Sequence, residues 1–390
     1  MDFELTTEQV AMRDMAKRLA EREFAPLLAR HDPDTALPKA IFLKVLQTLA
    51  PLGLTAPRLP AEAGGAGISM LDYGLVFEQL TPQIGMNLLS HEGCISRLFT
   101  ECTTQQQSRL LPALIAGQKI GCTGSTEPDT GSDPRGIKTR LHRDGGKLKL
   151  RGSKMWITNA SVCDLMIVTC IDARERKDSR SVVKVVVERE ASPFETREIE
   201  TIGLRQGYLG EAVFDDCEIP EENLIESADG GTAVLKKSWS INRPLVGLQA
   251  VHLGQKALDA AIEYAKVRVA FGKAIAGHQL IQKNLSDMAT SVTASRLLCY
   301  SALARADQGL PVEGSSAMAK RFAQTTCEQV IWQAMNVLGA LGLSREAGLE
   351  RLYRDARMLS IPDGTNELLA LIHGRELTGV EAFRGALPKA

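Results

Sequence analysis

The sequence predicts an α+β fold in which a β domain lies between two helical domains. Two observations predict it. Apolar residues recur at helical spacing at both ends of the chain, whereas β-branched and alternating runs dominate its middle. We therefore expect an N-terminal α-helical domain over residues 1–119, a middle domain with an antiparallel sheet or barrel over 120–229 and a C-terminal α-helical bundle domain over 230–390.

The N-terminal segment carries the signals of several helices. Thr6 and Gln9 have the spacing of a capping box, and Met12, Ala16 and Leu19 then recur on one helical face. Further helices are expected over 39–50, 70–83 and 104–117. The glycine-rich loop "PAEAGGAGIS" does not fit a dinucleotide-binding fingerprint, because no strand precedes it and its spacing is wrong.

The middle segment reads as strands. The turn signal "RDGG" precedes the alternating stretch "KLKLRG", which is typical of a β-hairpin. Three further runs, "DLMIVTCI", "SVVKVVVE" and "EAVFDDCEI", are rich in β-branched residues.

The C-terminal segment returns to helical spacing. Val251, Leu258, Ile262 and Ala265 lie along one stripe of a long helix. Later helices are expected over 278–308, 315–340 and 345–359, with a last one after Asp363.

The composition excludes several classes of function. The 46 Lys and Arg residues nearly balance 47 Asp and Glu residues, which argues against a nucleic-acid-binding protein. No apolar run approaches the roughly 18 residues of a membrane span, and the first residues show no apolar signal region. Eight scattered cysteines without metal-binding spacing indicate free thiols, so we expect a cytoplasmic protein without a metal site.

Two loops carry the small polar residues of a candidate ligand site, "GSTEPDTGSD" (124–133) and "KMWITNA" (154–160). The hydroxyls of the first loop could surround a planar heterocycle that is rich in hydrogen-bond acceptors, with Trp156 against its face and Thr158 at its edge. The alternative is a surface turn with a tryptophan in the core. The chain has no P-loop, no Gly-x-Ser-x-Gly and no His-Glu-x-x-His motif, so nucleophilic and metal-dependent hydrolysis have no support.

Five motifs together resemble the acyl-CoA dehydrogenase family of flavoproteins. They are "TEPDTGSD", "KMWITN", "RVAFGKAI" followed by "HQ", "RLYRDAR" and "DGTNE", and their order and separation fit that family over nearly the whole chain. The resemblance implies a middle β-barrel, a C-terminal four-helix bundle and FAD between the two. It also implies an acyl-CoA substrate, electron-transferring flavoprotein as electron acceptor and a homotetramer.

The resemblance implies which residues hold FAD. Thr126 would lie at the pyrimidine side of the flavin, Trp156 over one face and Thr158 at the N5 side. Arg268 and Phe271 would bind the FAD of a neighbouring subunit, where the planar guanidinium suits a pyrophosphate. The full implied set is Thr123, Ser125, Thr126, Ser132, Trp156, Ile157, Thr158, Arg268, Phe271, Gln279, Asn336, Gly339, Thr365 and Glu367.

The chain departs from the family at one cofactor motif. The family reads Gln-x-x-Gly-Gly where this chain has "NVLGAL", so that Asn336 replaces Gln and Ala340 replaces the second Gly. The shorter amide and the added methyl group put the local contact with FAD in doubt.

The implied substrate-binding residues are Ser132, Asn242, Arg243 and Gly364. Ser240 stands where some family members carry Asp, so carboxylate contacts to CoA do not transfer. Glu92 aligns loosely with the blind end of the acyl pocket, or else lies on a helix surface. The basic stretch 137–154 is a solvated sheet face or meets the phosphates of CoA or an acidic carrier protein.

Asp363 occupies the position of the family's catalytic base, which is usually Glu in a Glu-Gly-Thr turn. The alternative role is a helix N-cap or turn residue, which Pro-Asp-Gly-Thr favours by propensity. Asp is shorter than Glu by about 1.5 Å, so either the backbone of the turn sits closer to the substrate or the substrate presents its α carbon closer to the turn. Cyclohexanecarboxyl-CoA dehydrogenases resemble this chain in using Asp, which favours a ring-bearing or α-branched acyl thioester.

Other readings of the same fold stay open at this point. A nitroalkane oxidase also uses Asp but has an Arg soon after it, whereas the first Arg here is Arg375. A flavin monooxygenase does not need a carboxylate at this position. An acyl-carrier-protein dehydrogenase and a non-catalytic thioester-binding homologue are the remaining alternatives.

Overall fold

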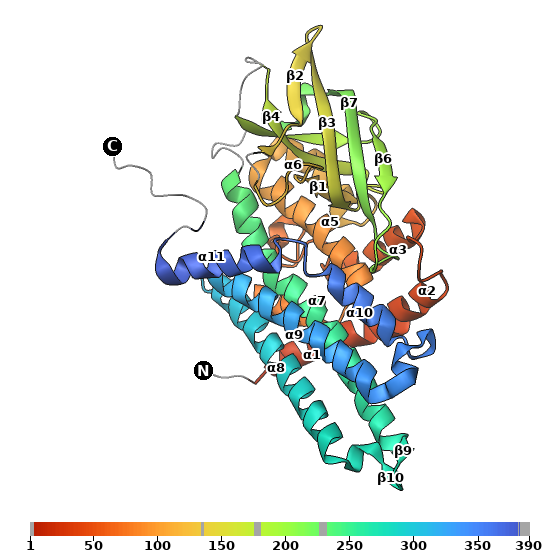
Figure 1. Ribbon diagram of the computed structural model, residues 1–390. Coiled ribbons are helices and arrows are strands. Elements are labelled where there is room, and N and C mark those ends of the chain that lie inside the picture. Colours follow the sequence, from red (N-terminus) through yellow and green to blue (C-terminus); the bar gives the residue numbers. More distant parts are fainter. Residues whose placement is uncertain (1–3, 134–135, 175–180, 226–231, 381, 383–390) are drawn as a thin grey trace.

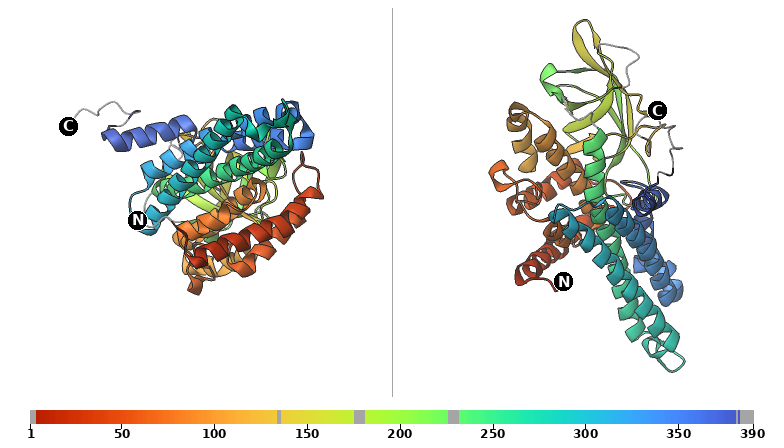
Figure 2. Two further views of the ribbon diagram at one scale, coloured as in Figure 1. Left: turned by 90° about the horizontal axis from the view of Figure 1, so that it is seen from below. Right: turned by 90° about the vertical axis from the view of Figure 1, so that its left-hand side faces the viewer.

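The structure is a computed structural model of the 390-residue chain, and it describes residues 4–133, 136–174, 181–225, 232–380 and 382. A β domain lies at one end of the molecule, and long helices extend away from it (Figure 1). The N-terminal helices pack along one side of the C-terminal bundle, as the two further views show (Figure 2). Three groups of elements therefore follow one another along the chain in the predicted order.

The N-terminal helices begin with the predicted capping box. The Thr6 hydroxyl accepts from Gln9 N, and the Gln9 side chain accepts from Thr6 N, at the start of α1. The elements are α1 (Thr7–Leu19), a π-helical turn (Ala20–Phe24), α2 (Ala25–Ala29), α3 (Lys39–Leu49), α4 (Met70–Phe77), α5 (Pro82–Glu101) and α6 (Thr104–Ile115). The expected helices over 39–50 and 104–117 are confirmed.

Helix α5 was not predicted, and the helix expected over 70–83 ends earlier, at Phe77. Pro82 begins α5 as its first residue, where the missing N–H of proline costs nothing. Helix α5 is buried on almost every side, and its buried residues include the polar Asn87, Glu92 and Arg97. Polar residues and glycines interrupt the apolar residues of this segment, and the sequence analysis did not identify it as a helix.

The β domain has one eight-stranded sheet in the order β6-β7-β3-β2-β4-β5-β8, with β1 beside β4. Its strands are β1 (Gly121–Gly124), β2 (Arg140–Asp144), β3 (Lys147–Thr158), β4 (Leu165–Asp172), β5 (Val182–Glu188), β6 (Glu195–Glu198), β7 (Leu209–Ile219) and β8 (Leu224–Ile225). The predicted hairpin joins β2 and β3, and both glycines of its turn have positive φ. One feature differs from the antiparallel expectation: β4 pairs in parallel with β1 and β2. Strand β4 is buried on both faces, as is usual for parallel strands.

The C-terminal bundle contains the helices α7 (Thr232–Val267), α8 (Gln279–Asp307), α9 (Glu313–Leu338), α10 (Leu349–Met358) and α11 (Asn366–Thr378), with a small hairpin of β9 (Val269–Ala270) and β10 (Lys273–Ala274) after α7. The predicted stripe of α7 faces the core: Val251, Leu258 and Ala265 are buried and Ile262 is half-buried. The predicted domain boundary at 229/230 lies outside the described residues. The other boundary, at 119/120, falls between α6 and β1.

Helix α5 contacts both the β domain and the C-terminal bundle. The Asn87 side chain accepts from Tyr208 N at 3.1 Å, and its carbonyl accepts from the Asn159 side chain at 2.9 Å. On the opposite side, Gly85 approaches α7 so closely that an added Cβ would lie 2.6 Å from the Gln249 side chain. Side chains carried by α5 are therefore fixed relative to both neighbouring domains.

Three findings on the described residues limit the possible functions of the protein. No helix in the described part of the chain is long and apolar enough to cross a membrane. Among the same residues, no group of His, Cys, Asp or Glu side chains could hold a metal ion. All eight cysteines are buried free thiols, as predicted.

Candidate active site

Asp363 lies in the turn between α10 and α11, and its backbone has a φ of 54°. A left-handed conformation is unfavourable for a residue with a Cβ, and such strain persists only where the surroundings enforce it. The N-cap of α11 is Thr365, whose hydroxyl accepts from Leu368 N at 3.3 Å. Asp363 is therefore not the N-cap, and capping does not explain its carboxylate.

Two buried cations hold this turn by its backbone. Arg243 Nε of α7 donates to the Asp363 carbonyl at 3.0 Å, and Lys320 Nζ of α9 donates to the Gly364 carbonyl at 2.7 Å. The side chains of Arg243 and Lys320 are both buried. These bonds fix the turn between two helices and leave the Asp363 carboxylate out of the clamp. The sequence analysis assigned Arg243 to the substrate and missed Lys320, whose only signal is a charge within the small-residue stretch "SSAMAKRFA".

Burial controls the protonation of this cluster. Burial raises the pKa of Asp363, and the positive charges of Lys320, Arg243, Arg97 and Arg58 offset only part of that rise. Burial also lowers the pKa of Lys320 to about 7, against the opposing effect of the Asp363 charge. A carboxylate with a raised pKa is a stronger base than one in water, so the site favours proton abstraction.

A polar network lies beside the Asp363 turn. Arg58 forms a two-point ion pair with the Glu92 carboxylate, and Arg58 Nη1 donates to Asn242 Oδ1 at 3.2 Å. Glu92 is fully buried, so its placement on a helix surface is wrong. Asn242 directly precedes Arg243 on α7, which links this network to the clamp. Arg58 was missed by the sequence analysis; a charged residue within "TAPRLP" was its only signal.

The "KMWITNA" motif forms a bulged strand end. The pairing of β3 with β7 shifts register between Lys154 and Ile157, and Trp156 there has a φ of 61°. This bulge turns Trp156 outward, so that 51% of its surface is exposed while Ile157 is buried. The alternative of a core tryptophan is therefore wrong. The Thr158 carbonyl accepts from Ser90 Oγ of α5 at 3.1 Å, which fixes the neighbouring strand end.

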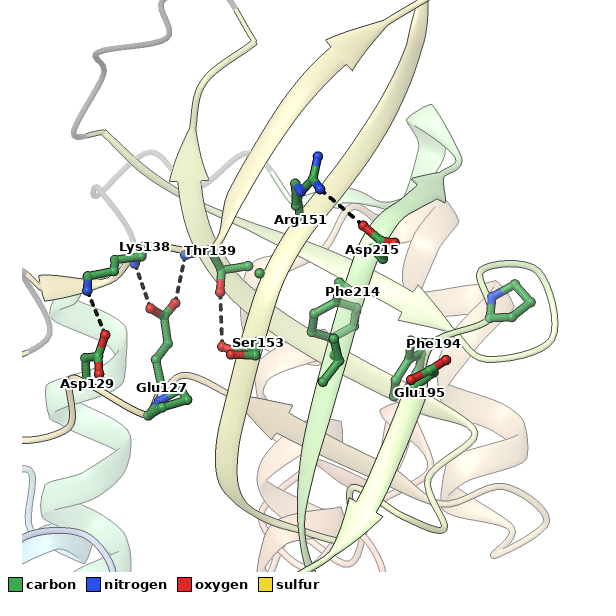
Figure 3. Close-up of a pocket in the computed structure, with 14 residues that line it drawn as sticks. Glu127, Asp129, Lys138, Thr139, Arg151, Ser153, Phe194, Glu195, Phe214 and Asp215 are labelled. Atoms are coloured by element: carbon green, nitrogen blue, oxygen red, sulfur yellow. Dashed lines mark hydrogen bonds and ion pairs between the residues drawn. The ribbon is translucent and has the colours of Figure 1, made fainter.

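The "TEPDTGSD" loop is anchored beside that strand. Thr126 O accepts from Met155 N at 3.0 Å, and the buried Glu127 carboxylate accepts from Lys154 Nζ at 2.7 Å. The same carboxylate also accepts from Lys138 N and Thr139 N (Figure 3). Glu127 is thus a structural anchor. The remaining predicted members of this loop lie as follows: Thr123 is half-buried in β1, the Ser125 hydroxyl bonds to that of Thr169, and Ser132 is exposed.

One pocket lies on the β domain, away from the Asp363 turn. It measures about 800 Å³ and lies on the outer side of the β domain, between the anchored loop and strands β3, β6 and β7 (Figure 3). Phe194 and Phe214 line it together with charges of both signs, such as Arg151 and Asp215. Asp363, Arg243 and Trp156 do not line it.

Five predicted cofactor residues belong to segments at the far end of the bundle. Arg268 and Phe271 stand at the turn after α7, Gln279 begins α8, and Asn336 and Gly339 stand at the C-terminal end of α9. All five are exposed. This end of the bundle points away from the β domain (Figure 1). Within one chain, the structure therefore does not bring the five residues together with the other predicted cofactor residues. Of the latter, Thr365 caps α11 and Glu367 is exposed in its first turn.

The residues near the β domain fit a flavin. An exposed aromatic face, Trp156, stands beside the half-buried Thr126 and Thr158, on a loop and a strand that are both anchored. Helix α5 carries both Ser90, which bonds to the end of this strand, and Glu92, which pairs with Arg58 beside the Asp363 turn. A planar ring with polar edges could therefore lie between the β domain and Asp363.

Comparisons with known proteins agree with this geometry. Residues 6–118 match the family description "Acyl-CoA dehydrogenase, N-terminal domain", residues 122–217 match the middle domain and residues 229–378 match the C-terminal domain.

Individual proteins show similarity along the whole chain. The cyclohex-1-ene-1-carbonyl-CoA dehydrogenase of Geobacter metallireducens is 35% identical over 383 residues, which cover 96% of this chain and 98% of that protein. The structure of butyryl-CoA dehydrogenase from Megasphaera elsdenii superposes with a TM-score of 0.89 at 29% identity, covering 97% of this chain and 100% of the other. An FAD complex of PigA superposes with a TM-score of 0.88 at 25% identity, covering 97% and 99% of the two chains.

Proposed function

Because the chain belongs to the acyl-CoA dehydrogenase family, we propose that it oxidises an acyl-CoA with Asp363 as the base that removes the α proton. The family is FAD-dependent, and FAD when bound supplies the acceptor for the hydride that leaves the β carbon. The observation that carries the proposal is the Asp363 turn. Its strained backbone is held by Arg243 and Lys320, while its carboxylate stays outside that clamp.

The surroundings of Asp363 suit an enolate-forming reaction. The α C–H of a thioester is a weak acid, so orientation and stabilisation of developing negative charge must lower the barrier. The raised pKa strengthens the carboxylate as a base. We assign the Asp363 backbone N–H as the donor to the thioester oxygen, and the buried charges of Arg243 and Lys320 favour the negative charge that develops nearby.

The short base suggests the kind of acyl group. Asp reaches about 1.5 Å less far than Glu, so the α carbon must lie closer to the backbone of the turn. We propose a ring-bearing or α-branched acyl thioester, and the similarity to a cyclohex-1-ene-1-carbonyl-CoA dehydrogenase supports this choice. A kinetic panel of cyclic, branched and straight acyl-CoAs tests it. Faster turnover of straight medium-chain thioesters would contradict it.

The exposed end of the bundle suggests an oligomer. Arg268, Phe271 and Gln279 belong to segments at the end of the bundle that points away from the β domain. We propose that they bind the FAD of a neighbouring copy in a homotetramer, and that electron-transferring flavoprotein accepts the electrons. Size measurement of the FAD-loaded protein, and reduction of added electron-transferring flavoprotein, test the two proposals separately.

One anaerobic titration tests the proposed function. The purified yellow protein should lose its visible flavin absorbance when an acyl-CoA is added. Bleaching by nitroalkanes alone would instead indicate an oxidase, and bleaching by acyl-carrier proteins alone a different thioester. Colourless protein that binds no FAD would indicate a non-catalytic homologue.

A further inference from the structure

The motif "RLYRDAR" has no role in the proposed reaction, although it lies shortly before the Asp363 turn. Its Asp355 stands in the last turn of α10 and is only 2% exposed. The Asp355 carboxylate accepts from Leu204 N at 2.5 Å and from Gln83 Nε2 at 2.7 Å, and Arg351 Nε lies 3.9 Å from it. Leu204 belongs to the segment between β6 and β7, and Gln83 belongs to α5. Asp355 therefore joins α10 to the β domain and to α5.

The segment between β6 and β7 also packs against α10 with its main chain. Leu204 has a φ of 55°, and a residue with a Cβ keeps such a conformation only where its surroundings hold it. A Cβ added to Gly203 would lie 2.3 Å from the Arg354 carbonyl oxygen, so this close approach requires glycine. The Arg354 side chain also donates to the Ile202 carbonyl at 2.9 Å. Backbone packing and the Asp355 carboxylate thus hold the same segment.

The other end of this segment supports the strand end of the "KMWITNA" motif. A 2.8 Å backbone hydrogen bond to the Leu204 carbonyl closes a tight turn just before Tyr208. The Tyr208 carbonyl then accepts from Asn159 N at 3.2 Å, and Leu209 pairs with Thr158 in the sheet. The position of the segment therefore affects the residues that we propose to hold the flavin.

On the other side, a short and well-supported stretch joins Asp355 to Asp363. Backbone hydrogen bonds of 3.1 to 3.4 Å continue past the end of α10 as far as Ile361. Leu359 and Ser360 within this stretch are buried. A displacement of α10 would therefore move the Asp363 turn or strain the two hydrogen bonds that clamp it.

We propose that Asp355 is a positioning residue, which holds the Asp363 turn in place relative to the strand end that supports the flavin. This inference rests on the proposed function. The thioester oxygen would bond to the Asp363 N–H, so the α carbon follows the turn, whereas the flavin position follows the β domain. Loss of the Asp355 contact should therefore misplace the β carbon relative to the flavin but leave the α carbon near the base.

Two rates measured on the FAD-loaded protein separate these effects. Flavin bleaching by an acyl-CoA requires both the base and the flavin, whereas α-deuterium exchange of an acyl-CoA without β hydrogen requires the base alone. A misplacement of about 1 Å can cost about 10²-fold in rate. Asp355→Ala should therefore slow bleaching by about tenfold to 10²-fold and α exchange by no more than about threefold. Asp355→Asn keeps one acceptor, and its bleaching rate should lie between those of wild type and Asp355→Ala.

Gly203→Ala disturbs the same contact from its opposite side. The added methyl group would push the segment away from α10, so this variant should also slow bleaching more than α exchange. Asp355→Asn and Gly203→Ala in one chain should slow bleaching by less than the product of their separate effects, because both break one contact.

Hydrogen exchange of the protein gives a readout that does not depend on activity. Peptides covering 199–209 and 359–365 should both exchange faster in Asp355→Ala and in Gly203→Ala, relative to the rest of the chain. Met288→Ala, at a fully buried position of α8, is the control for lost stability without loss of this contact. It should lower the melting temperature without slowing bleaching relative to α exchange.

Two outcomes would overturn the proposal. One is equal slowing of bleaching and α exchange in Asp355→Ala, the result expected from a general loss of stability. The other is unchanged hydrogen exchange over 199–209 and 359–365. Asp355→Asn and Gly203→Ala provide the same test where Asp355→Ala does not fold. Absence of both bleaching and α exchange in wild type would instead contradict the proposed function itself.

Discussion

The two ends of the C-terminal bundle carry the same strained backbone in opposite surroundings. Asp363 has a φ of 54° and Phe271 a φ of 51°. The Asp363 turn is held through its carbonyls by Arg243 and Lys320 of the same chain. Phe271, by contrast, is 96% exposed at the tip of a two-stranded hairpin.

The comparison distinguishes a turn whose supporting contacts all come from one chain from a surface that we propose a second chain covers. The Asp363 turn has its supporting hydrogen bonds in place, so its backbone geometry is set before any ligand binds. The Phe271 end presents a large apolar side chain and Arg268 to solvent, which fits a surface that becomes covered in an assembly. If this comparison is correct, substitutions at the Asp363 turn should slow the reaction, whereas substitutions at the Phe271 end should weaken FAD binding or assembly.

The largest effect is expected at the base. Asp363→Asn keeps the shape of the side chain but removes the proton acceptor, so flavin reduction by acyl-CoA should slow by about 10²- to 10⁴-fold. Stopped-flow absorbance measures the rate, and FAD content should remain unchanged. Asp363→Glu is the matched variant: it restores a carboxylate and should recover part of the rate. Near-full activity of Asp363→Asn would remove Asp363 from the mechanism.

The next effect is expected at the opposite end. Arg268→Glu places a negative charge where we propose a pyrophosphate, so the purified protein should retain about tenfold to 10²-fold less tightly bound FAD. Equilibrium dialysis measures retention, and light scattering reports the size of the assembly. The FAD affinity of Arg268→Lys should lie between those of the wild type and Arg268→Glu. Normal FAD affinity in Arg268→Glu would show that this end does not serve the cofactor.

A smaller effect is expected from the clamp and depends on pH. Asp363 must be ionised to act, and its pKa lies above the usual value of 3.8, so the rate should rise with pH through that raised pKa. The Lys320 charge lowers the Asp363 pKa. Lys320→Met should therefore move the acidic limb of the kcat/KM profile to higher pH. An unmoved or lowered limb would contradict the assigned charge effect.

Lys320→Met should also cost about 1–3 kcal/mol of stability, because it leaves the Gly364 carbonyl without its donor. Arg321→Met, at the exposed neighbouring position, is a control for loss of positive charge without loss of this bond. Urea denaturation followed by circular dichroism measures both variants.

The smallest effect is expected at the altered cofactor motif. Asn336→Gln combined with Ala340→Gly restores the longer amide and removes the methyl group at exposed positions. We expect FAD to bind about twofold to tenfold more tightly, corresponding to one improved hydrogen bond. Weaker binding would show that this chain has adapted the motif to its own geometry.

The order of domains and most elements could be predicted because local signals were strong. The Thr6 capping box, the "RDGG" hairpin and the stripe of α7 all depend on residues close together in sequence. Helix α5 was missed because buried polar residues and glycines interrupt its apolar residues, and their burial follows from contacts with distant elements.

At the candidate site, too, the sequence did not reveal features that depend on distant residues. Motif resemblance located Asp363 and Trp156, but it gave no reason for their strained backbones, which come from long-range contacts and a bulge. The roles of Arg58 and Lys320 could not be read from sequence, because each depends on which distant groups the fold places around it. Pairing between distant residues is visible only in three dimensions.

The central claim is that Asp363 takes the α proton, and isotope exchange tests it without requiring hydride transfer. An acyl-CoA whose β carbon carries no hydrogen is incubated with the FAD-loaded protein in D₂O, and mass spectrometry follows deuterium at the α carbon. The account predicts exchange by wild type, and exchange at least about 10²-fold slower by Asp363→Asn. Equal exchange rates in the two proteins would contradict it.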